Sequence, residues 1–290
     1  MPEVQVLRDG LGIPESLRWH DGRLWFANWI GQEIVAVDAD GTAEFTPAPV
    51  VPLMGWSIEW QPDGRLLTTG DKVRRLESDG SVSVLSEQSS NEIVADRRGN
   101  VYLNGTDFDF AGGEAPKPGY LMLLTPDGEV RKVALDIQFP NGMVITPDNR
   151  TLVVSESFAG RLTAFDIQID GGLTNRRTFA EGLGPDGICL DAEGAIWVST
   201  GGSSVVRVAD GGEVLQRVEL PEHRAPFALA LGGSDGTTLY IGTAEWHSDQ
   251  PISDNLDRLI TGPRGGQILT VQVKVPAHRP SEYGCAPEPR

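Results

Sequence analysis

The chain has 290 residues and a formal net charge of −17 at pH 7, from 24 basic and 41 acidic residues. A hydrophobic fraction of 39% supports a packed core and argues against a disordered protein. The acidic field disfavours nucleic acid and anionic membranes as partners, and no stretch approaches the roughly 20 apolar residues of a membrane-spanning helix. The sequence begins without a basic segment followed by an apolar run, so we expect a cytoplasmic protein.

The cysteines and histidines are few and scattered. Cys189 lies in the apolar stretch Gly187-Ile-Cys-Leu190 and is predicted to be a core residue, whereas Cys285 lies in a polar tail. One pair of cysteines makes no disulfide framework, and no two of the four histidines have metal-ligand spacing. The sequence therefore disfavours a metal site built from His or Cys.

Short β-rich runs follow one another along the chain, such as residues 23–28 and 195–199. Asp-Gly pairs separate many of these runs, at 21–22, 40–41, 63–64, 79–80, 127–128 and 210–211. Such pairs favour tight hairpins with type I′ turns, in which both central residues have positive φ. No long segment has the apolar period of a helix, so the sequence predicts an all-β protein.

Six segments share one pattern, in which a small or proline residue precedes an anchor residue and a short apolar strand. They span residues 12–19, 55–60, 90–95, 140–145, 185–190 and 226–231, and their anchors are Glu15, Trp56, Asn91, Asn141, Asp186 and Phe227. The anchors are separated by 41, 35, 50, 45 and 41 residues. A period in the forties with about four strands per unit predicts a six-bladed β-propeller.

The two ends of the chain are predicted to meet. Residues 3–7 and 266–273 are both strand-like and can complete one blade together. No linker divides the sequence, so we expect residues 1–290 to form one domain with a tail from about residue 275. The long gap after Asn91 contains an insertion at 106–119, with Asp107, Asp109 and Glu114, which we expect to form a loop near one face.

Equivalent positions of successive blades form a ring around the axis, and four of the six anchors carry side-chain oxygens. Asn141 and Asp186 each precede a glycine, so each alone could simply form a turn. That explanation does not cover Glu15, which has the same register. Oxygen ligands without His or Cys favour Ca²⁺ or Mg²⁺ over zinc, with Trp56 and Phe227 as an apolar wall beside the metal.

Four motifs in order at blade spacing resemble the senescence-marker-protein/gluconolactonase/luciferin-regenerating-enzyme family. They are Gly12-Ile-Pro-Glu15-Ser-Leu-Arg-Trp19, Ser90-Asn91-Glu92, Pro140-Asn141-Gly142 with Thr146-Pro-Asp148, and Pro185-Asp186-Gly187 with Asp191-Ala-Glu-Gly194-Ala-Ile-Trp197-Val198. The resemblance runs from about residue 11 to 273. It implies a six-bladed propeller with a central divalent cation held by Glu15, Asn141 and Asp186, and with Asn91 beside the substrate.

The chain departs from the family pattern at two places. Sugar-lactone members have an Arg two residues before the Asn91 position and an Asp after it, where this chain has Ser89 and Glu92. Glu156 stands where family members usually have Asp. Glu156 is a candidate carboxylate that either supports the metal ligands from behind or contacts the substrate. The alternative is a surface acid at the end of a strand.

The resemblance implies a metal-dependent hydrolase that opens a small lactone. Asp186 is the candidate general base as well as a metal ligand, and Ca²⁺ is favoured over Mg²⁺, Mn²⁺ and Zn²⁺. Asn91, Trp56, Phe227 and Glu156 are the candidate substrate contacts. Trp246 with His247 either extends the pocket or, as the favoured alternative, forms a surface loop. The alternatives are a calcium-dependent phosphotriesterase-like hydrolase and a non-catalytic propeller that binds a metal or metabolite.

Overall fold

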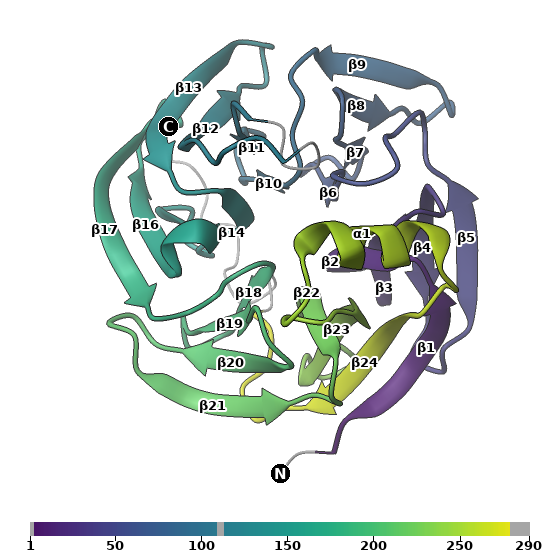
Figure 1. The fold of residues 1–290 in the computed structure, drawn as a ribbon. Coiled ribbons are helices and arrows are strands. Elements are labelled where there is room, and N and C mark those ends of the chain that lie inside the picture. Colours follow the sequence, from purple (N-terminus) through teal and green to yellow (C-terminus); the bar gives the residue numbers. More distant parts are fainter. Residues whose placement is uncertain (1–2, 109–112, 279–290) are drawn as a thin grey trace.

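Six four-stranded antiparallel sheets surround a central axis in the computed structural model, which describes residues 3–108 and 113–278 (Figure 1). The prediction of an all-β six-bladed propeller is confirmed. The first strand of each blade lies at the axis, and these inner strands contact one another from blade to blade.

The blades follow one another in chain order. Blade 1 contains β2 (Ile13–His20), β3 (Arg23–Trp29), β4 (Glu33–Val37) and β5 (Ala43–Pro47), and blade 2 contains β6 (Ile58–Trp60), β7 (Leu66–Thr68), β8 (Val73–Leu76) and β9 (Val82–Ser86). Blade 3 contains β10 (Ile93–Ala95), β11 (Val101–Gly105), β12 (Gly119–Leu124) and β13 (Val130–Ile137), and blade 4 contains β14 (Pro140–Ile145), β15 (Thr151–Glu156), β16 (Arg161–Ile167) and β17 (Leu173–Glu181). Blade 5 contains β18 (Ile188–Leu190), β19 (Ile196–Ser199), β20 (Ser204–Val208) and β21 (Val214–Glu219), and blade 6 contains β22 (Arg224–Gly232), β23 (Thr238–Glu245), β24 (Gly266–Gln272) and β1 (Gln5–Leu11).

Blade 6 closes the ring with strands from both ends of the sequence. The N-terminal strand β1 pairs antiparallel with β24, and Val6 lies opposite Leu269. This is the closure that the two strand-like terminal segments predicted. Because the ring is closed in this way, the first and last blades bury their faces against each other rather than leaving them open to solvent.

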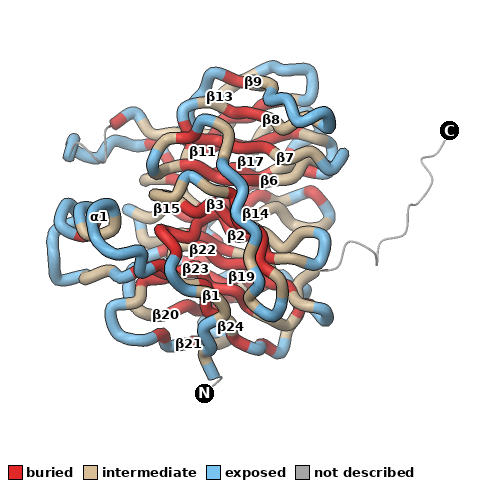
Figure 2. Tube along the Cα trace, turned by 90° about the vertical axis from the view of Figure 1, so that its right-hand side faces the viewer, coloured by how far each residue is buried: buried red, intermediate tan, exposed pale blue. Residues whose placement is uncertain are grey.

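The apolar core lies between neighbouring blades. One cluster joins Trp197 and Val218 of blade 5 to Leu229 and Ile241 of blade 6, and another joins Phe26 and similar residues of blade 1 to blade 6. Figure 2 shows these buried segments as red bands through the interior, with exposed turns at the periphery. Each sheet therefore depends on its neighbours for burial of its faces.

The Asp-Gly turns are mostly of a different type from the one expected. At Asp40-Gly41 only the glycine has positive φ (85°), and the Asp40 carboxylate accepts a hydrogen bond from the Thr42 backbone amide at 2.9 Å. The Gly41 amide also donates to the carbonyl of Asp38. This arrangement is a longer hairpin loop that ends in a left-handed glycine. Among the six pairs, only Asp21-Gly22 has positive φ at both residues.

The glycines after Asn141 and Asp186 serve close packing rather than turns. Neither Gly142 nor Gly187 has positive φ. A Cβ atom on Gly142 would lie 2.7 Å from the Asp186 carbonyl oxygen and 2.9 Å from the Gly187 Cα, and one on Gly187 would overlap the Phe227 carbonyl. The turn-forming explanation for the two anchors is therefore wrong, because these glycines let neighbouring inner strands approach each other.

One α-helix interrupts the all-β pattern of the described residues, which the prediction of an all-β chain did not include. Helix α1 (Ile252–Thr261) lies between β23 and β24 and stands out from one face of the ring (Figures 1 and 2). Within the helix, Leu256 and Leu259 are half-buried, whereas Ile252 and Ile260 are exposed. A 3₁₀ turn, η1 (Ser157–Ala159), follows β15. No helix among the described residues has the length and apolarity to cross a membrane.

Two predicted features fall partly outside the described residues. Asp109 of the insertion and Cys285 of the tail are not among them. The described part of the insertion follows β11, and its Asp107 carboxylate lies 3.8 Å from the Lys132 ammonium group of β13. The insertion thus connects β11 to β12 and contacts β13 of the same blade, blade 3.

Substitution of Gly142 by Ala tests the packing of the inner strands. The added Cβ would meet the backbone of blade 5, so we expect a loss of about 1–3 kcal/mol in the free energy of unfolding, as for overpacked cores. Urea denaturation followed by circular dichroism measures it. The matched control is Gly202→Ala, because a Cβ there meets no atom within 4 Å. Equal stability of the two variants would contradict the close-packing account.

Candidate active site

The six anchors lie at the start of the innermost strand of their blades. Glu15, Asn141 and Phe227 lie within β2, β14 and β22, and Trp56, Asn91 and Asp186 lie two residues before β6, β10 and β18. The strand bounds place every anchor near the start of an inner strand, and their common register stays a prediction.

Bulges in three inner strands set the direction of the anchor side chains. In β2 the pairing with β3 shifts register between Glu15 and Arg18, and Ser16 has a φ of 53°. A similar register shift lies between Pro140 and Met143 in β14, next to Asn141. Another lies between Pro226 and Ala228 in β22, at Phe227. In a regular strand, residues three apart face opposite sides, so the bulge allows both Glu15 and Arg18 to join one buried charge cluster.

Hydrogen bonds between neighbouring blades join several of the anchors. The Ser57 hydroxyl donates to the Asn91 carbonyl at 2.6 Å, which links blade 2 to blade 3. The Gly142 amide donates to the Asp186 carbonyl at 3.3 Å, and the Gly187 amide donates to the Phe227 carbonyl at 2.8 Å. These bonds fix the backbone at Asn91, Asp186 and Phe227 and beside Asn141.

Asn104 in β11 clamps the segment that carries Asn91. Its buried Oδ1 accepts hydrogen bonds from the amides of Asn91 and Glu92 at 3.0 and 2.9 Å, and its Nδ2 donates to the Pro140 carbonyl at 2.7 Å. The clamp brings Asn91 of blade 3 next to Asn141 of blade 4. The sequence reading did not identify Asn104, because it lies outside the repeated anchor motif.

Glu15 and Asp186 form an electrostatically strained pair of carboxyl groups. Burial raises the pKa of Glu15, and the nearby charges of Asp186 and Glu92 raise it further. Burial and the charge of Glu92 likewise raise the pKa of Asp186. The Glu15 carboxyl group is buried and that of Asp186 is half-buried, and desolvation and nearby negative charge disfavour the ionised form of each, so a cation between them would relieve the charge.

The arginine nearest to these carboxylates is already engaged. Arg18 donates to Glu59 at 3.0 Å and to Glu92 at 3.1 Å, and to the carbonyls of Leu17 and Ile93. The Ser57 hydroxyl donates to the same Glu92 carboxylate at 2.9 Å. This Arg18–Glu59–Glu92 cluster was not predicted. The signal was present in the Glu15-Ser-Leu-Arg18 motif, but an unbroken strand would have separated its two charged side chains.

The predicted ligand set fits a hard cation by its chemistry. Glu15, Asn141 and Asp186 offer two carboxylates and one amide oxygen, and the neighbouring Asn91 Oδ1 is buried without a hydrogen-bond partner. Within residues 3–108 and 113–278, no three His, Cys, Asp or Glu side chains form a metal-binding group. The proposed set is consistent with this finding, because it contains only two carboxylates and its third ligand is the amide oxygen of an asparagine. Oxygen donors favour Ca²⁺ or Mg²⁺.

The two aromatic anchors differ in their surroundings. Trp56 is 0% exposed and packs with Ala27 and Ile58 between blades 1 and 2. Phe227 is half-buried, and its ring contacts Trp246 edge-on with centroids 5.9 Å apart. Trp246 therefore adjoins the anchor ring, as the sequence suggested, whereas Trp56 belongs to the packed core. Contact of Trp56 with a substrate stays a prediction.

His247 is fixed by helix α1. Its amide donates to Oδ1 of the fully buried Asn255 at 2.8 Å, and the Asn255 Nδ2 donates back to the His247 carbonyl at 2.9 Å. The His247 ring lies 2.8 Å from the Glu245 carboxylate and stacks on the His223 ring. The helix thus holds the Trp246–His247 segment against blade 6.

Glu156 lies in the interior of blade 4 and is not a surface acid. It is 0% exposed, and its Oε2 accepts from the Gln138 amide at 2.8 Å. Its Oε1 accepts from Thr163, Arg161 and Arg176 at 2.5, 3.0 and 2.9 Å. Burial acts to raise the pKa of Glu156, but these hydrogen bonds and the Arg176 charge lower it on balance. Its contacts hold the turn before β14 in place, and a contact with substrate stays a prediction.

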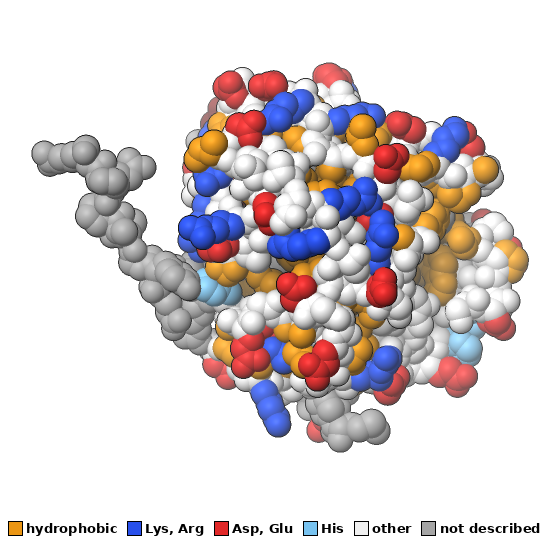
Figure 3. Space-filling view, turned by 90° about the vertical axis from the view of Figure 1, so that its left-hand side faces the viewer, with side chains coloured by type: hydrophobic (Ala, Val, Ile, Leu, Met, Phe, Trp, Pro, Cys, Tyr) orange, Lys and Arg blue, Asp and Glu red, His pale blue; other side chains and the backbone are white. Residues whose placement is uncertain are grey.

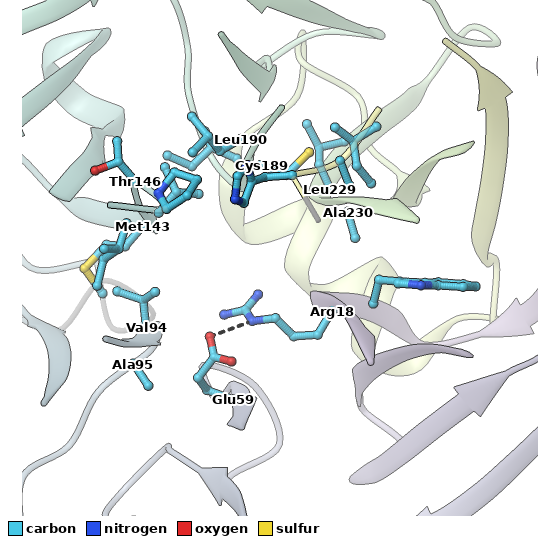
Figure 4. Close-up of a pocket in the computed structure, with 18 of the residues that line it drawn as sticks. Arg18, Glu59, Val94, Ala95, Met143, Thr146, Cys189, Leu190, Leu229 and Ala230 are labelled. Carbon is cyan, nitrogen blue, oxygen red and sulfur yellow. Dashed lines mark hydrogen bonds and ion pairs between the residues drawn. The ribbon is translucent and has the colours of Figure 1, made fainter. Parts of the chain in front are cut away.

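A separate cavity of about 360 Å³ opens farther along the inner strands, beyond the anchor ring (Figure 4). Apolar side chains such as Met143, Leu190 and Leu229 surround it, together with the Arg18–Glu59 pair. Cys189 is half-buried at its edge, so it is less enclosed than the predicted core residue. The charged cluster thus lies between this cavity and the anchor ring.

On one side of the molecule, basic and acidic side chains are interspersed (Figure 3). Figure 3 shows one side of the molecule, where Lys and Arg side chains alternate with Asp and Glu. Examples from blade 4 and its neighbour are the pairs of Arg177 with Asp166 at 2.7 Å and Arg131 with Asp170 at 3.2 Å. On this side the surface carries both charges, so the net charge does not form a single acidic patch there.

Glu156→Gln should destabilise the fold by about 2–3 kcal/mol at pH 7, because a buried charged hydrogen-bond network loses its acceptor. The folded-state pKa of Glu156 is lowered, so its contribution is complete above the unfolded pKa of about 4.3 and is lost as the pH falls below it. Urea unfolding of both proteins between pH 7 and pH 3 gives the difference in their free energies of unfolding. We expect this difference to be constant near neutral pH and to shrink as the pH falls below about 4.3. A difference independent of pH would contradict the ionised role of Glu156.

The comparisons with known proteins agree with this architecture. A family model for the SMP-30/gluconolactonase/LRE-like region matches residues 13–245. The chain is 29% identical over 292 residues to pentonolactonase XacC of Haloferax volcanii, covering 94% of this chain and 95% of that protein. It is 29% identical to regucalcin of Danio rerio, covering 82% and 85% of the two chains. A solved luciferin-regenerating enzyme shares the fold, with a TM-score of 0.78, 18% identity and coverage of 96% and 98%. The chain belongs to the SMP-30/gluconolactonase/LRE-like family.

Proposed function

We propose that this protein is a metal-dependent lactonase whose active site is the anchor ring at the channel mouth. The observation that carries the proposal is the carboxyl pair of buried Glu15 and half-buried Asp186, whose pKa values are raised first by desolvation and then by neighbouring carboxylates. Family membership and the similarity to a protein named pentonolactonase support lactone hydrolysis as the reaction. The substrate is proposed to be a small lactone.

Glu15, Asn141 and Asp186 are proposed to hold one divalent cation, with Ca²⁺ favoured by their oxygen donors. The bound cation supplies positive charge for the carbonyl oxygen as it becomes an oxyanion. The inter-blade hydrogen bonds at Gly142 and Gly187 keep the Asn141 and Asp186 backbones fixed, so little reorganisation accompanies binding. The buried Oδ1 of Asn91 adds a further acceptor beside this set.

The reaction adds water across the ring ester bond. The water oxygen bonds to the carbonyl carbon, the ring C–O bond breaks, and the released ring oxygen takes up a proton to give a hydroxy acid. Asp186 is proposed to accept the proton from the attacking water, because among residues 3–108 and 113–278 no other side chain hydrogen-bonds to its carboxylate. Asn91 is proposed to orient the lactone, with Phe227 and Trp246 on the blade 6 side.

Hydrolysis of a lactone panel tests the proposal. Gluconolactone, other aldonolactones, γ-butyrolactone and dihydrocoumarin are assayed after chelation and after addition of Ca²⁺, Mg²⁺, Mn²⁺ or Zn²⁺. We expect chelation to abolish turnover of at least one lactone and one of the metals to restore it. Unchanged turnover after complete chelation would contradict metal dependence, and faster hydrolysis of paraoxon than of every lactone would favour a phosphotriesterase.

Asp186→Asn should lower kcat/KM for the best lactone by about 100-fold or more, as expected when a general base is removed. The blades supply the stability, so its circular dichroism spectrum and unfolding midpoint should stay near those of the wild type. Asp210→Asn is the matched control, because Asp210 lies exposed in an outer turn of blade 5. Full activity of Asp186→Asn would remove Asp186 from the mechanism.

A further inference from the structure

A second, smaller pocket lies beside Asn91 between blades 2, 3 and 4. Its volume is about 250 Å³, and its wall includes Gly55, Ser89, Thr106 and Phe139. None of the described residues that line it has a charged side chain. Neutral hydroxyl and amide groups therefore face one aromatic ring across a space large enough for one small ring compound.

Phe139 reaches this pocket through an unusual backbone conformation. Its φ is 58°, in the left-handed region that aromatic residues rarely adopt. The residue precedes Pro140 and Asn141, so the same turn delivers the ring to the pocket and begins the strand with the proposed metal ligand. Strain of this kind is concentrated at sites where a side chain must point in a particular direction.

Surrounding contacts hold Phe139 in this conformation. The Ser157 amide donates to the Phe139 carbonyl at 3.1 Å, and the preceding residue, Gln138, accepts from the Phe158 amide at 3.2 Å and donates to the Glu156 carboxylate. The Phe139 ring stacks on Phe158 with centroids 4.4 Å apart and an interplanar angle of 11°. Glu156 therefore acts on the site indirectly, by fixing the turn that presents Phe139.

We infer that Phe139 is a specificity-determining residue that stacks on the ring of an uncharged lactone, and that the pocket selects such lactones over anionic ones. The inference rests on the proposed lactonase function and names the substrate class of that site. One face of the bound ring contacts the phenyl group, while Asn91 and Ser89 offer neutral hydrogen-bonding groups to its edge. Apart from the proposed cation beside Asn91, an anionic substituent would find no cationic side chain in the described lining and would meet an overall charge of −17.

Ligand binding tests the inference independently of turnover. The probes are δ-valerolactam and 6-oxopiperidine-2-carboxylate, which share a six-membered ring and differ in one carboxylate, and calorimetry gives their dissociation constants. We expect the wild type to bind the uncharged lactam at least tenfold more tightly. Phe139→Leu should weaken that binding by roughly tenfold, as expected for loss of an aromatic contact. Ser89→Lys should narrow the preference by adding a cation at the wall.

Two further variants separate binding from folding. Phe139→Asn removes the ring, and with it the packing on Phe158 and Phe108, but it suits the left-handed backbone, so the turn should still form while the same affinity is lost. Phe45→Leu is the matched control, because Phe45 lies exposed on the outer strand β5. Unchanged lactam affinity in both Phe139 variants, or equal binding of the two lactams by the wild type, would overturn the inference. Lactam binding of the expected pattern without any lactone hydrolysis would overturn the proposed reaction alone.

Discussion

The central constraint on this structure is an excess of buried negative charge in a narrow channel. The carboxyl groups of Glu15, Glu59, Glu92 and Asp186 influence one another, and the guanidinium of Arg18 lies among them. Arg18 neutralises Glu59 and Glu92 by direct ion pairs, which leaves Glu15 and Asp186 to oppose each other. Buried charge of this kind is costly unless it is paired or coordinates a metal. A divalent cation at the channel mouth would balance that pair.

The propeller scaffold makes this arrangement possible by bringing six short inner strands together. Glycine at 142 and 187 allows neighbouring strands to approach within hydrogen-bonding distance of each other's backbone. Bulges in β2, β14 and β22 then direct individual side chains toward the axis. Since each blade buries its faces only against its neighbours, the stability of the ring and the geometry of the site depend on the same contacts. The positions of Glu15 and Asn141 are therefore set by inner strands, whereas Asp186 lies two residues before β18 and is held by backbone hydrogen bonds to Gly142 and Ser199.

The sequence predicted the blades, their number and the closing strands, because these features repeat along the chain. It did not predict the features that occur only once in the chain and are not repeated from blade to blade. Helix α1 was missed although Ile252, Leu256 and Leu259 have helical spacing, because the helix is only ten residues long. Arg18 and Asn104 were missed because a bulge and a contact between distant strands bring them to the site, and neither can be read from local spacing. The burial of Trp56 and Glu156 likewise depends on tertiary packing, which the alternation of apolar residues does not resolve at strand ends.

The most direct test of the account is the number of divalent cations that the channel binds. Calcium is titrated into chelator-treated protein by isothermal calorimetry, for the wild type, Glu15→Gln and the exposed-turn control Glu213→Gln. We expect the wild type and the control to bind one Ca²⁺ per chain, and Glu15→Gln to lose that binding. Absence of binding by the wild type, or undiminished binding by Glu15→Gln, would contradict the claim that the carboxylate pair is a cation site.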